Sequence, residues 1–203
     1  MDMFTIGITG PTGSGKTSAL RALESLGALA LDCDKIYHEL LAECTEMKQE
    51  INARFPGVLS DGIIDRKALR EIVFNDPAAL LELNAITHKY IAAERERRVR
   101  QWQSQGGRIV GVDAIALIES GLGKTCNAVV GVVSPAETRI ARIIARDGLT
   151  RAGAEQRISA QKPERFFEEN CDYLLRNVYN THEEFEAECK AFFINLIGGY
   201  INE

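Results

Sequence analysis

Short apolar runs recur along the chain, and each ends at a polar residue or a glycine. They lie at residues 4–9, 28–31, 108–113, 128–133 and 173–176. Their β-branched and aliphatic side chains predict buried strands. Helix-forming residues follow most of them, and strands that alternate with helices indicate a parallel sheet covered on both faces. We therefore expect an α/β fold with three layers, α/β/α, around a five-stranded parallel sheet.

The polar and apolar pattern between these runs predicts helices with recognisable ends. Gly27 is expected to stop the first helix, and residues 181–197 form an amphipathic helix near the C-terminus. Ser134, Pro135 and Glu137 have the spacing of a capping box with proline at the first helical position. We expect a helix to begin there.

The stretch 35–105 is longer than one crossover between strands requires, and its pattern indicates helix throughout. Asp65 is placed to cap one helix, and Asp76 followed by Pro77 starts another. That second helix is expected to run through the charged stretch 93–100, a solvated face, and to end at the glycines 106 and 107. We infer an inserted helical subdomain.

Composition narrows the class of protein. The chain has 203 residues, which suits one compact domain with an insertion, and its net charge of −5 argues against general nucleic-acid binding. Five scattered cysteines without a C-x-x-C pair indicate reduced thiols in a cytoplasmic protein. We find no signal peptide and no apolar run of about 20 residues, so no membrane association is expected. A monomer or a small homo-oligomer fits these observations.

The chemistry is concentrated first in residues 10–17, which read GPTGSGKT. This matches the P-loop pattern G-x-x-x-x-G-K-S/T, and it follows a predicted strand and opens a predicted helix. The glycines allow a tight turn whose N–H groups face phosphate oxygens, and the helix N-terminus favours the same anion. Lys16 is expected to reach the β- and γ-phosphates of ATP, and Thr17 to offer its hydroxyl to Mg²⁺.

A P-loop occurs in switches, ATPases and phosphotransferases, and the remaining motifs separate these classes. The chain contains neither D-x-x-G nor N-K-x-D, the usual signals of a guanine-nucleotide switch. Its third strand ends at Asp113 followed by Ala114, without the neighbouring glutamate that activates water in hydrolytic enzymes. Both observations favour transfer of phosphate over hydrolysis.

Two acids follow the second strand, Asp32 and Asp34. Ligands of open parallel sheets collect beyond the carboxyl ends of the strands, so these carboxylates are expected near the γ-phosphate. One would accept the proton of an attacking hydroxyl, and the other would hold Mg²⁺ or its water. The alternative is that either acid only caps the helix that begins near Lys35.

Taken together, these blocks resemble the dephospho-CoA kinase family over nearly the whole chain. The matching blocks are residues 10–17, the Asp-x-Asp at 32–34, and the segments 65–74, 83–91 and 113–119, followed by Arg142, Arg146, Arg157, Gln161, Asp172, Tyr173 and Asn177. The resemblance implies a P-loop NTPase core at about 1–34, 106–146 and 168–203, a helical acceptor-binding domain at about 35–105 and a lid at about 147–167. It also implies transfer of the γ-phosphate of ATP to the ribose 3′-hydroxyl of dephospho-CoA, with Mg²⁺.

The resemblance also implies roles for individual residues. Asp34 would be the general base, Asp32 would support Mg²⁺ with Thr17, and Lys16 and Arg142 would neutralise the moving phosphoryl group. Arg146 would help them, unless it only faces the dipole of its helix. The nucleotide would contact Gly10, Pro11, Thr12, Gly13, Ser14, Gly15, Lys16, Thr17, Arg142, Arg146 and Asn177. The acceptor would contact Asp34, Arg66, His88, Leu117 and Glu119. The alternative for His88 is a structural role, which is as common for a lone histidine within a helix.

Two positions depart from the family pattern. Lys89 stands where the family has a proline after the histidine, which would fuse two helices that are otherwise separated. Ile115 stands where the family has the proline of its Asp-x-Pro-Leu-Leu block, which would alter the acceptor pocket. The alternatives are therefore a P-loop kinase for another small nucleotide or alcohol, and a nucleotide-binding module without catalysis, which the paired acids and the arginines argue against.

Overall fold

The computed structural model describes residues 3–74, 76–114 and 116–201. The chain divides into two compact units, one made of Met1–Leu31 with Trp102–Glu203 and the other of Asp32–Gln101. The first contains the sheet, and the second contains most of the predicted insertion. Within the described residues, no helix is both long enough and apolar enough to cross a membrane.

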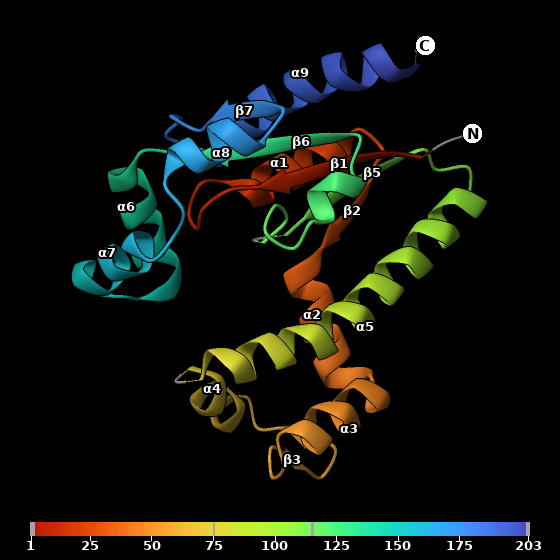
Figure 1. The fold of residues 1–203 in the computed structure, drawn as a ribbon. Coiled ribbons are helices and arrows are strands. Elements are labelled where there is room, and N and C mark those ends of the chain that lie inside the picture. The colour runs from red at the N-terminus through yellow and green to blue at the C-terminus, as the bar shows by residue number, and fades with distance from the viewer. Residues whose placement is uncertain (1–2, 75, 115, 202–203) are drawn as a thin grey trace. The chain divides into compact units, whose positions relative to one another are not determined.

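The five predicted strands form one parallel sheet, as expected (Figure 1). They are β1 (Phe4–Thr9), β2 (Leu29–Asp32), β5 (Ile109–Asp113), β6 (Ala128–Val133) and β7 (Tyr173–Arg176), in the order β2-β5-β1-β6-β7. The central strand β1 pairs with β5 on one side and β6 on the other. Thr9, its last residue, leads directly into residues 10–17, so the glycine loop lies at the carboxyl edge of the sheet.

Successive side chains of β1 point to opposite faces of the sheet. Ile6 and Ile8 are fully buried in a core that includes Phe185 and Phe193. Phe185 and Phe193 come from α9 (His182–Ile201), and α1 (Lys16–Ser25) adds further apolar side chains to the same core. Between them in sequence, Gly7 leaves space for Leu117 on the opposite face. The buried layer fixes β1, and with it the start of the glycine loop.

Most helices begin and end where the capping and stop residues of the sequence predict. Gly27 adopts φ 82° and ends α1, and Asp76 accepts hydrogen bonds from the first turn of α5 (Pro77–Ser104). Asp65 caps α4 (Arg66–Phe74) in the same way. Helix α5 continues without a break through Lys89, as the absence of the family proline predicts. It ends before Gly106 at φ 87°.

The predicted capping box of α6 is wrong. Helix α6 (Ala136–Asp147) has Pro135 as its N-cap, outside the helix, with no side-chain cap. The Ser134 hydroxyl instead donates to the carbonyl of Asn177 at 2.7 Å. Glu137 pairs with Arg151 at 2.8 Å. Tertiary partners therefore take both side chains that the local motif would have used.

The insertion and the segment after α6 also contain more separate helices and strands than the sequence predicted. The second unit holds α2 (Cys33–Glu43) and α3 (Thr45–Arg54), and then a small hairpin of β3 (Leu59–Ser60) and β4 (Ile63–Ile64) that the helical interpretation missed. After α6, residues form two helices, α7 (Arg151–Ser159) and α8 (Glu164–Asn170), and the short 3₁₀ helix η1 (Leu122–Thr125) precedes β6. The turn of the hairpin is Asp61-Gly62 with positive φ at both residues, the usual sequence of a tight hairpin.

Candidate active site

Residues 10–17 form an open loop whose shape depends on glycine. Gly10 has φ 144°, and a Cβ there would overlap the carbonyl oxygen of Val132 in β6. Gly15 has φ 111°, and a Cβ there would overlap the amide of Asn177. The loop is therefore pressed against its own sheet and needs residues without a side chain at both places.

The end of the loop presents the N-terminus of α1 without neutralising it. Gly15 is the N-cap, no side chain caps the helix, and the first turn carries no acid. The partial positive charge of the helix end is thus not offset by a local carboxylate. This arrangement fits a bound phosphate, which would supply the missing acceptors.

Lys16 lies along the loop that precedes it. Its Nζ donates to the carbonyl oxygen of Gly10 at 3.0 Å and to that of Pro11 at 3.4 Å. These contacts hold the ammonium group over the loop. Thr17, next in the chain, is exposed in the first turn of α1, where a hydroxyl is accessible to a metal ion.

Arg142 of α6 supports the loop from behind. Its guanidinium donates to the carbonyls of Gly13 at 3.1 Å and Ser14 at 3.4 Å, to Asn177 Oδ1 at 3.2 Å and to the carbonyl of Tyr179 at 3.1 Å. Most of its N–H groups are therefore engaged with protein oxygens. Contact between Arg142 and a phosphoryl group stays a prediction, and its observed contacts show a role in fixing the loop.

Asn177 lies in the same network. Its Nδ2 donates to the carbonyl of Ser14 at 2.9 Å, and only 1% of its surface is exposed. The structure thus brings together Lys16, Ser14, Arg142 and Asn177 around one loop. Direct contact of Asn177 with a nucleotide stays a prediction.

Sequence reasoning missed Arg139, and it gave Gln161 no contact. Arg139 is 8% exposed and its Nε donates to the carbonyl of Thr12 at 2.9 Å. Gln161, between α7 and α8, bonds to the same Thr12. The available signal was the position of Arg139 one helical turn before Arg142, on the same face of α6.

Two guanidinium groups therefore contact the loop, that of buried Arg139 and that of half-buried Arg142. Burial lowers the pKa of both Arg139 and Arg142 from the ordinary arginine value, although arginine stays cationic in proteins. No described carboxylate forms an ion pair with either of them. Cations that are shielded from water and have no acidic partner favour a polyanion at the loop that they contact.

Arg146 behaves differently. It is more exposed and forms a two-pronged contact with Asp147, at 2.7 Å and 3.0 Å. Arg157 pairs with the same carboxylate. The hydrogen bond from Arg146 is the main reason that the pKa of Asp147 falls to about 2. A phosphate contact for Arg146 stays a prediction.

The two acids at the junction of β2 and α2 take separate positions. Asp32 is the N-cap of α2, and its Oδ1 accepts from the backbone N–H of Lys35 at 3.0 Å. Asp34 is exposed in the first turn of α2. The capping alternative therefore applies to Asp32 and not to Asp34. The described residues contain no cluster of three acids, histidines or cysteines that would bind a metal by itself.

The residues predicted to contact the acceptor are spread over several elements. Arg66 and His88 are exposed on α4 and α5 of the second unit, and Glu119 is exposed in the first unit. Leu117 is fully buried beside Gly7, so it serves the core, and the structure gives no support to its predicted contact with substrate. Ile115 lies outside the described residues.

Lys89, the first departure from the family pattern, has a defined partner. Its Nζ contacts Glu50 Oε1 at 2.5 Å, and the Tyr90 hydroxyl donates to Glu50 Oε2 at 2.9 Å. The hydrogen bond with Glu50 is also the main reason that the pKa of Tyr90 rises to about 12. Lys89 therefore ties α5 to α3 within the second unit.

Comparison with known proteins gives a consistent result. The family model described as dephospho-CoA kinase matches residues 4–183. The dephospho-CoA kinase of Geobacter sulfurreducens is 41% identical over 79% of this chain and 83% of its own length. That of Geobacter metallireducens is 37% identical over 94% of this chain and 96% of its own.

Solved structures agree with the sequence relatives. The dephospho-CoA kinase of Campylobacter jejuni superposes with a TM-score of 0.68 and 27% identity, over 97% of this chain and 98% of that one. The glycine loop and the sheet order are consistent with these similarities. This chain belongs to the dephospho-CoA kinase family.

Proposed function

We propose that this protein transfers the γ-phosphate of ATP to the ribose 3′-hydroxyl of dephospho-CoA, which yields CoA and ADP. The observation that carries the proposal is the loop of residues 10–17, with its uncapped helix end and the guanidinium groups of buried Arg139 and half-buried Arg142 that donate to its carbonyls. Family membership supplies the acceptor, because the matching model and relatives are dephospho-CoA kinases.

The proposed mechanism assigns the proton and the phosphoryl group separately. The carboxylate of Asp34 accepts the proton of the 3′-hydroxyl as the ribose oxygen attacks the γ-phosphorus. The bond from that phosphorus to the bridging oxygen breaks, and ADP leaves. Lys16 and the loop amides stabilise the charge on the transferred group, the main source of catalysis in this reaction type.

Magnesium belongs to the proposal as the ion that would accompany ATP. When bound, it would neutralise charge on the β- and γ-phosphates. Thr17 and Asp32 would hold it, with water and phosphate oxygens as the other ligands. Mg²⁺ in such sites is bound through only one or two protein groups, so a complete protein cage is not required. The exposed hydroxyl of Thr17 next to the uncapped helix end fits this role.

We place the reaction in the cytoplasm. None of the five cysteines, among them the buried Cys33 and Cys189, forms a disulfide within the described residues. Reduced cysteines are typical of a reducing compartment.

The test is an acceptor panel. Purified protein with ATP and Mg²⁺ is offered dephospho-CoA, nucleosides, nucleotides and sugar acids, and ADP release is measured with a coupled assay. We expect turnover with dephospho-CoA, its loss when EDTA removes the metal, and a product that carries one added phosphate by mass spectrometry. Turnover only with another acceptor would contradict the proposal and favour a P-loop kinase of different specificity.

A further inference from the structure

Gln161 joins the segment after α7 to the glycine loop. Its Oε1 accepts from the backbone N–H of Thr12 at 3.1 Å and from Arg139 Nη2 at 2.5 Å, and its Nε2 donates to Thr12 Oγ1 at 2.6 Å. Arg139 Nε donates to the carbonyl of Thr12 at 2.9 Å, so Thr12, Gln161 and Arg139 contact one another in a triangle. All three polar groups of Thr12 are therefore held by two side chains from far along the chain.

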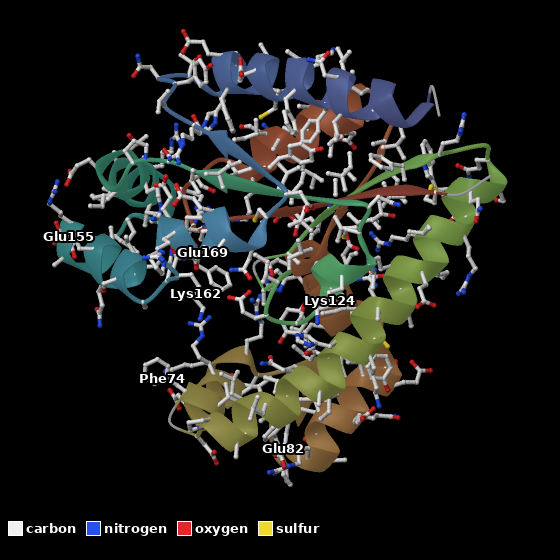
Figure 2. The ribbon with its side chains drawn as sticks, turned by 45° about the horizontal axis from the view of Figure 1, so that its top comes forward. Phe74, Glu82, Lys124, Glu155, Lys162 and Glu169 are labelled. Carbon is white, nitrogen blue, oxygen red and sulfur yellow. The ribbon has the colours of Figure 1, made fainter. Side chains whose placement is uncertain are left out.

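The chemistry of the triangle fixes the orientation of the amide. Thr12 N–H and the guanidinium of Arg139 are both donors, so only the oxygen of Gln161 can face them. The amide nitrogen then faces the hydroxyl of Thr12, as observed. Side chains near this segment are drawn in Figure 2, where Lys162, the next residue along the chain, is labelled.

The neutral amide of Gln161 contrasts with the partners of nearby arginines. Arg146, Arg151, Arg157 and Arg176 are on the surface, and each of them contacts a carboxylate. Arg139 is almost fully buried, and over the described residues it has no acidic partner. A glutamate at position 161 would satisfy the same two donors. The amide therefore differs from that residue mainly in leaving the positive charge of Arg139 in place.

We propose that Gln161 is a positioning residue for the nucleotide: it holds Thr12 in the loop and keeps the charge of Arg139 uncompensated beside it. The inference rests on the proposed function, because it requires the loop to bind ATP. It adds a residue whose neutrality determines nucleotide affinity. The residue acts through Thr12 and Arg139 and takes no part in the proton or phosphoryl transfer.

The decisive variant is Gln161→Glu. A carboxylate accepts from Thr12 N–H and Arg139, and the Thr12 hydroxyl can turn to donate to it, so the three contacts survive. The charge of Arg139 is neutralised, however. We expect an unchanged or higher Tm together with a Kd for ATP raised about tenfold, since one charge close to a triphosphate has an effect of at least that size. The KM for dephospho-CoA is expected to stay the same.

A second variant separates contact from charge. Gln161→Met has a similar volume, removes the three hydrogen bonds and leaves Arg139 charged. We expect a lower Tm, with the Kd for ATP raised less than in Gln161→Glu when both are measured by calorimetry well below their Tm. A purely structural residue would give the opposite order, with ATP affinity following stability.

Gln156→Glu is the matched control. Gln156 is exposed on α7, so the variant adds the same charge to the same region without touching the triangle. We expect its Kd for ATP and Tm to equal those of the wild type. An equal loss of ATP affinity in Gln156→Glu and Gln161→Glu, or wild-type affinity in a folded Gln161→Glu, would overturn the inference. Wild-type protein that binds no ATP would overturn the proposed function as well.

Discussion

The carboxylate of Asp32 accepts a hydrogen bond of 3.0 Å from the backbone N–H of Lys35. This contact makes Asp32 the N-cap of α2 and leaves Asp34 inside the first turn. Of the two acids of the Asp-x-Asp segment, only Asp32 caps the helix, although the two lie only two residues apart in the sequence. Their substitution should therefore separate stability from catalysis.

Asp34→Asn is expected to keep the fold and ATP binding while kcat falls by roughly 10²-fold, because a general base contributes on that scale. The side chain is exposed, so its loss as an acid should leave Tm nearly unchanged. Single-turnover transfer and calorimetric ATP titration measure the two properties. Undiminished kcat in this variant would remove Asp34 from the proposed mechanism.

Substitutions of Asp32 provide the comparison. Asp32→Ala is expected to lower the free energy of unfolding by about 1 kcal/mol through the lost cap, whereas Asp32→Asn should preserve it, since asparagine caps equally well. Both should raise the Mg²⁺ concentration that half-maximal turnover requires, because a proposed ligand of the ion is lost. Equal stability of the Ala and Asn variants in urea would show that the cap contributes little.

Lys16→Ala is expected to reduce transfer to near background. The ammonium group contacts the carbonyls of Gly10 and Pro11, so the variant loses both a phosphate ligand and a brace of the loop. Turnover is measured with saturating dephospho-CoA over a wide range of ATP. Recovery of full kcat at high ATP would mean that Lys16 acts in ground-state binding alone.

Arg142→Lys is expected to disturb the glycine loop as much as removing most of the Arg142 side chain would. The guanidinium spans Gly13, Ser14, Asn177 and Tyr179, and an ammonium group cannot reproduce that planar set of donors. We expect a lower Tm and a higher KM for ATP. Arg146→Lys, on the exposed neighbour, should change Tm little, because surface ion pairs contribute only about 0–1 kcal/mol. Similar behaviour of the two variants would contradict the bracing role of Arg142.

Much of this architecture could be predicted because it depends on local patterns. The strands, the glycine loop and the cap at Asp65 follow from apolar runs and from turn chemistry within a few residues. Arg139 and Gln161 could not be placed, since their partner Thr12 is 127 and 149 residues away along the chain. The capping box at Ser134 failed for the same reason: the Ser134 hydroxyl donates to the carbonyl of Asn177, which is distant in sequence, and does not cap the helix.

Lys89→Pro tests the continuity of α5. The helix runs unbroken over Pro77–Ser104, and proline at position 89 would remove one backbone hydrogen bond and clash with the preceding turn. We expect a loss of about 3 kcal/mol in the free energy of unfolding by urea. Lys89→Ala, which loses the exposed contacts with Glu50 and with the ring of Tyr90, should cost about 1 kcal/mol or less. Equal stability of the two variants would mean that α5 accommodates a proline at position 89.

The two high-pKa thiols should differ in how pH affects their reactivity. Burial raises the pKa of Cys171 to about 11 and that of Cys189 to about 12, so at pH 8 each carries very little of the reactive thiolate. Cys171 is partly exposed, whereas Cys189 is fully buried in the core with Phe185 and Phe193.

For Cys171, the rate of alkylation by iodoacetamide should therefore rise about tenfold per pH unit between pH 8 and 10, as the thiolate fraction does below the pKa. For Cys189, the rate should stay low over the same range, because the reagent reaches it only when the core opens. Peptide mass spectrometry of native protein follows both, and urea should make them react alike. A Cys189 that responded to pH as Cys171 does, in folded protein, would show that α9 leaves the sheet far more readily than its buried packing implies.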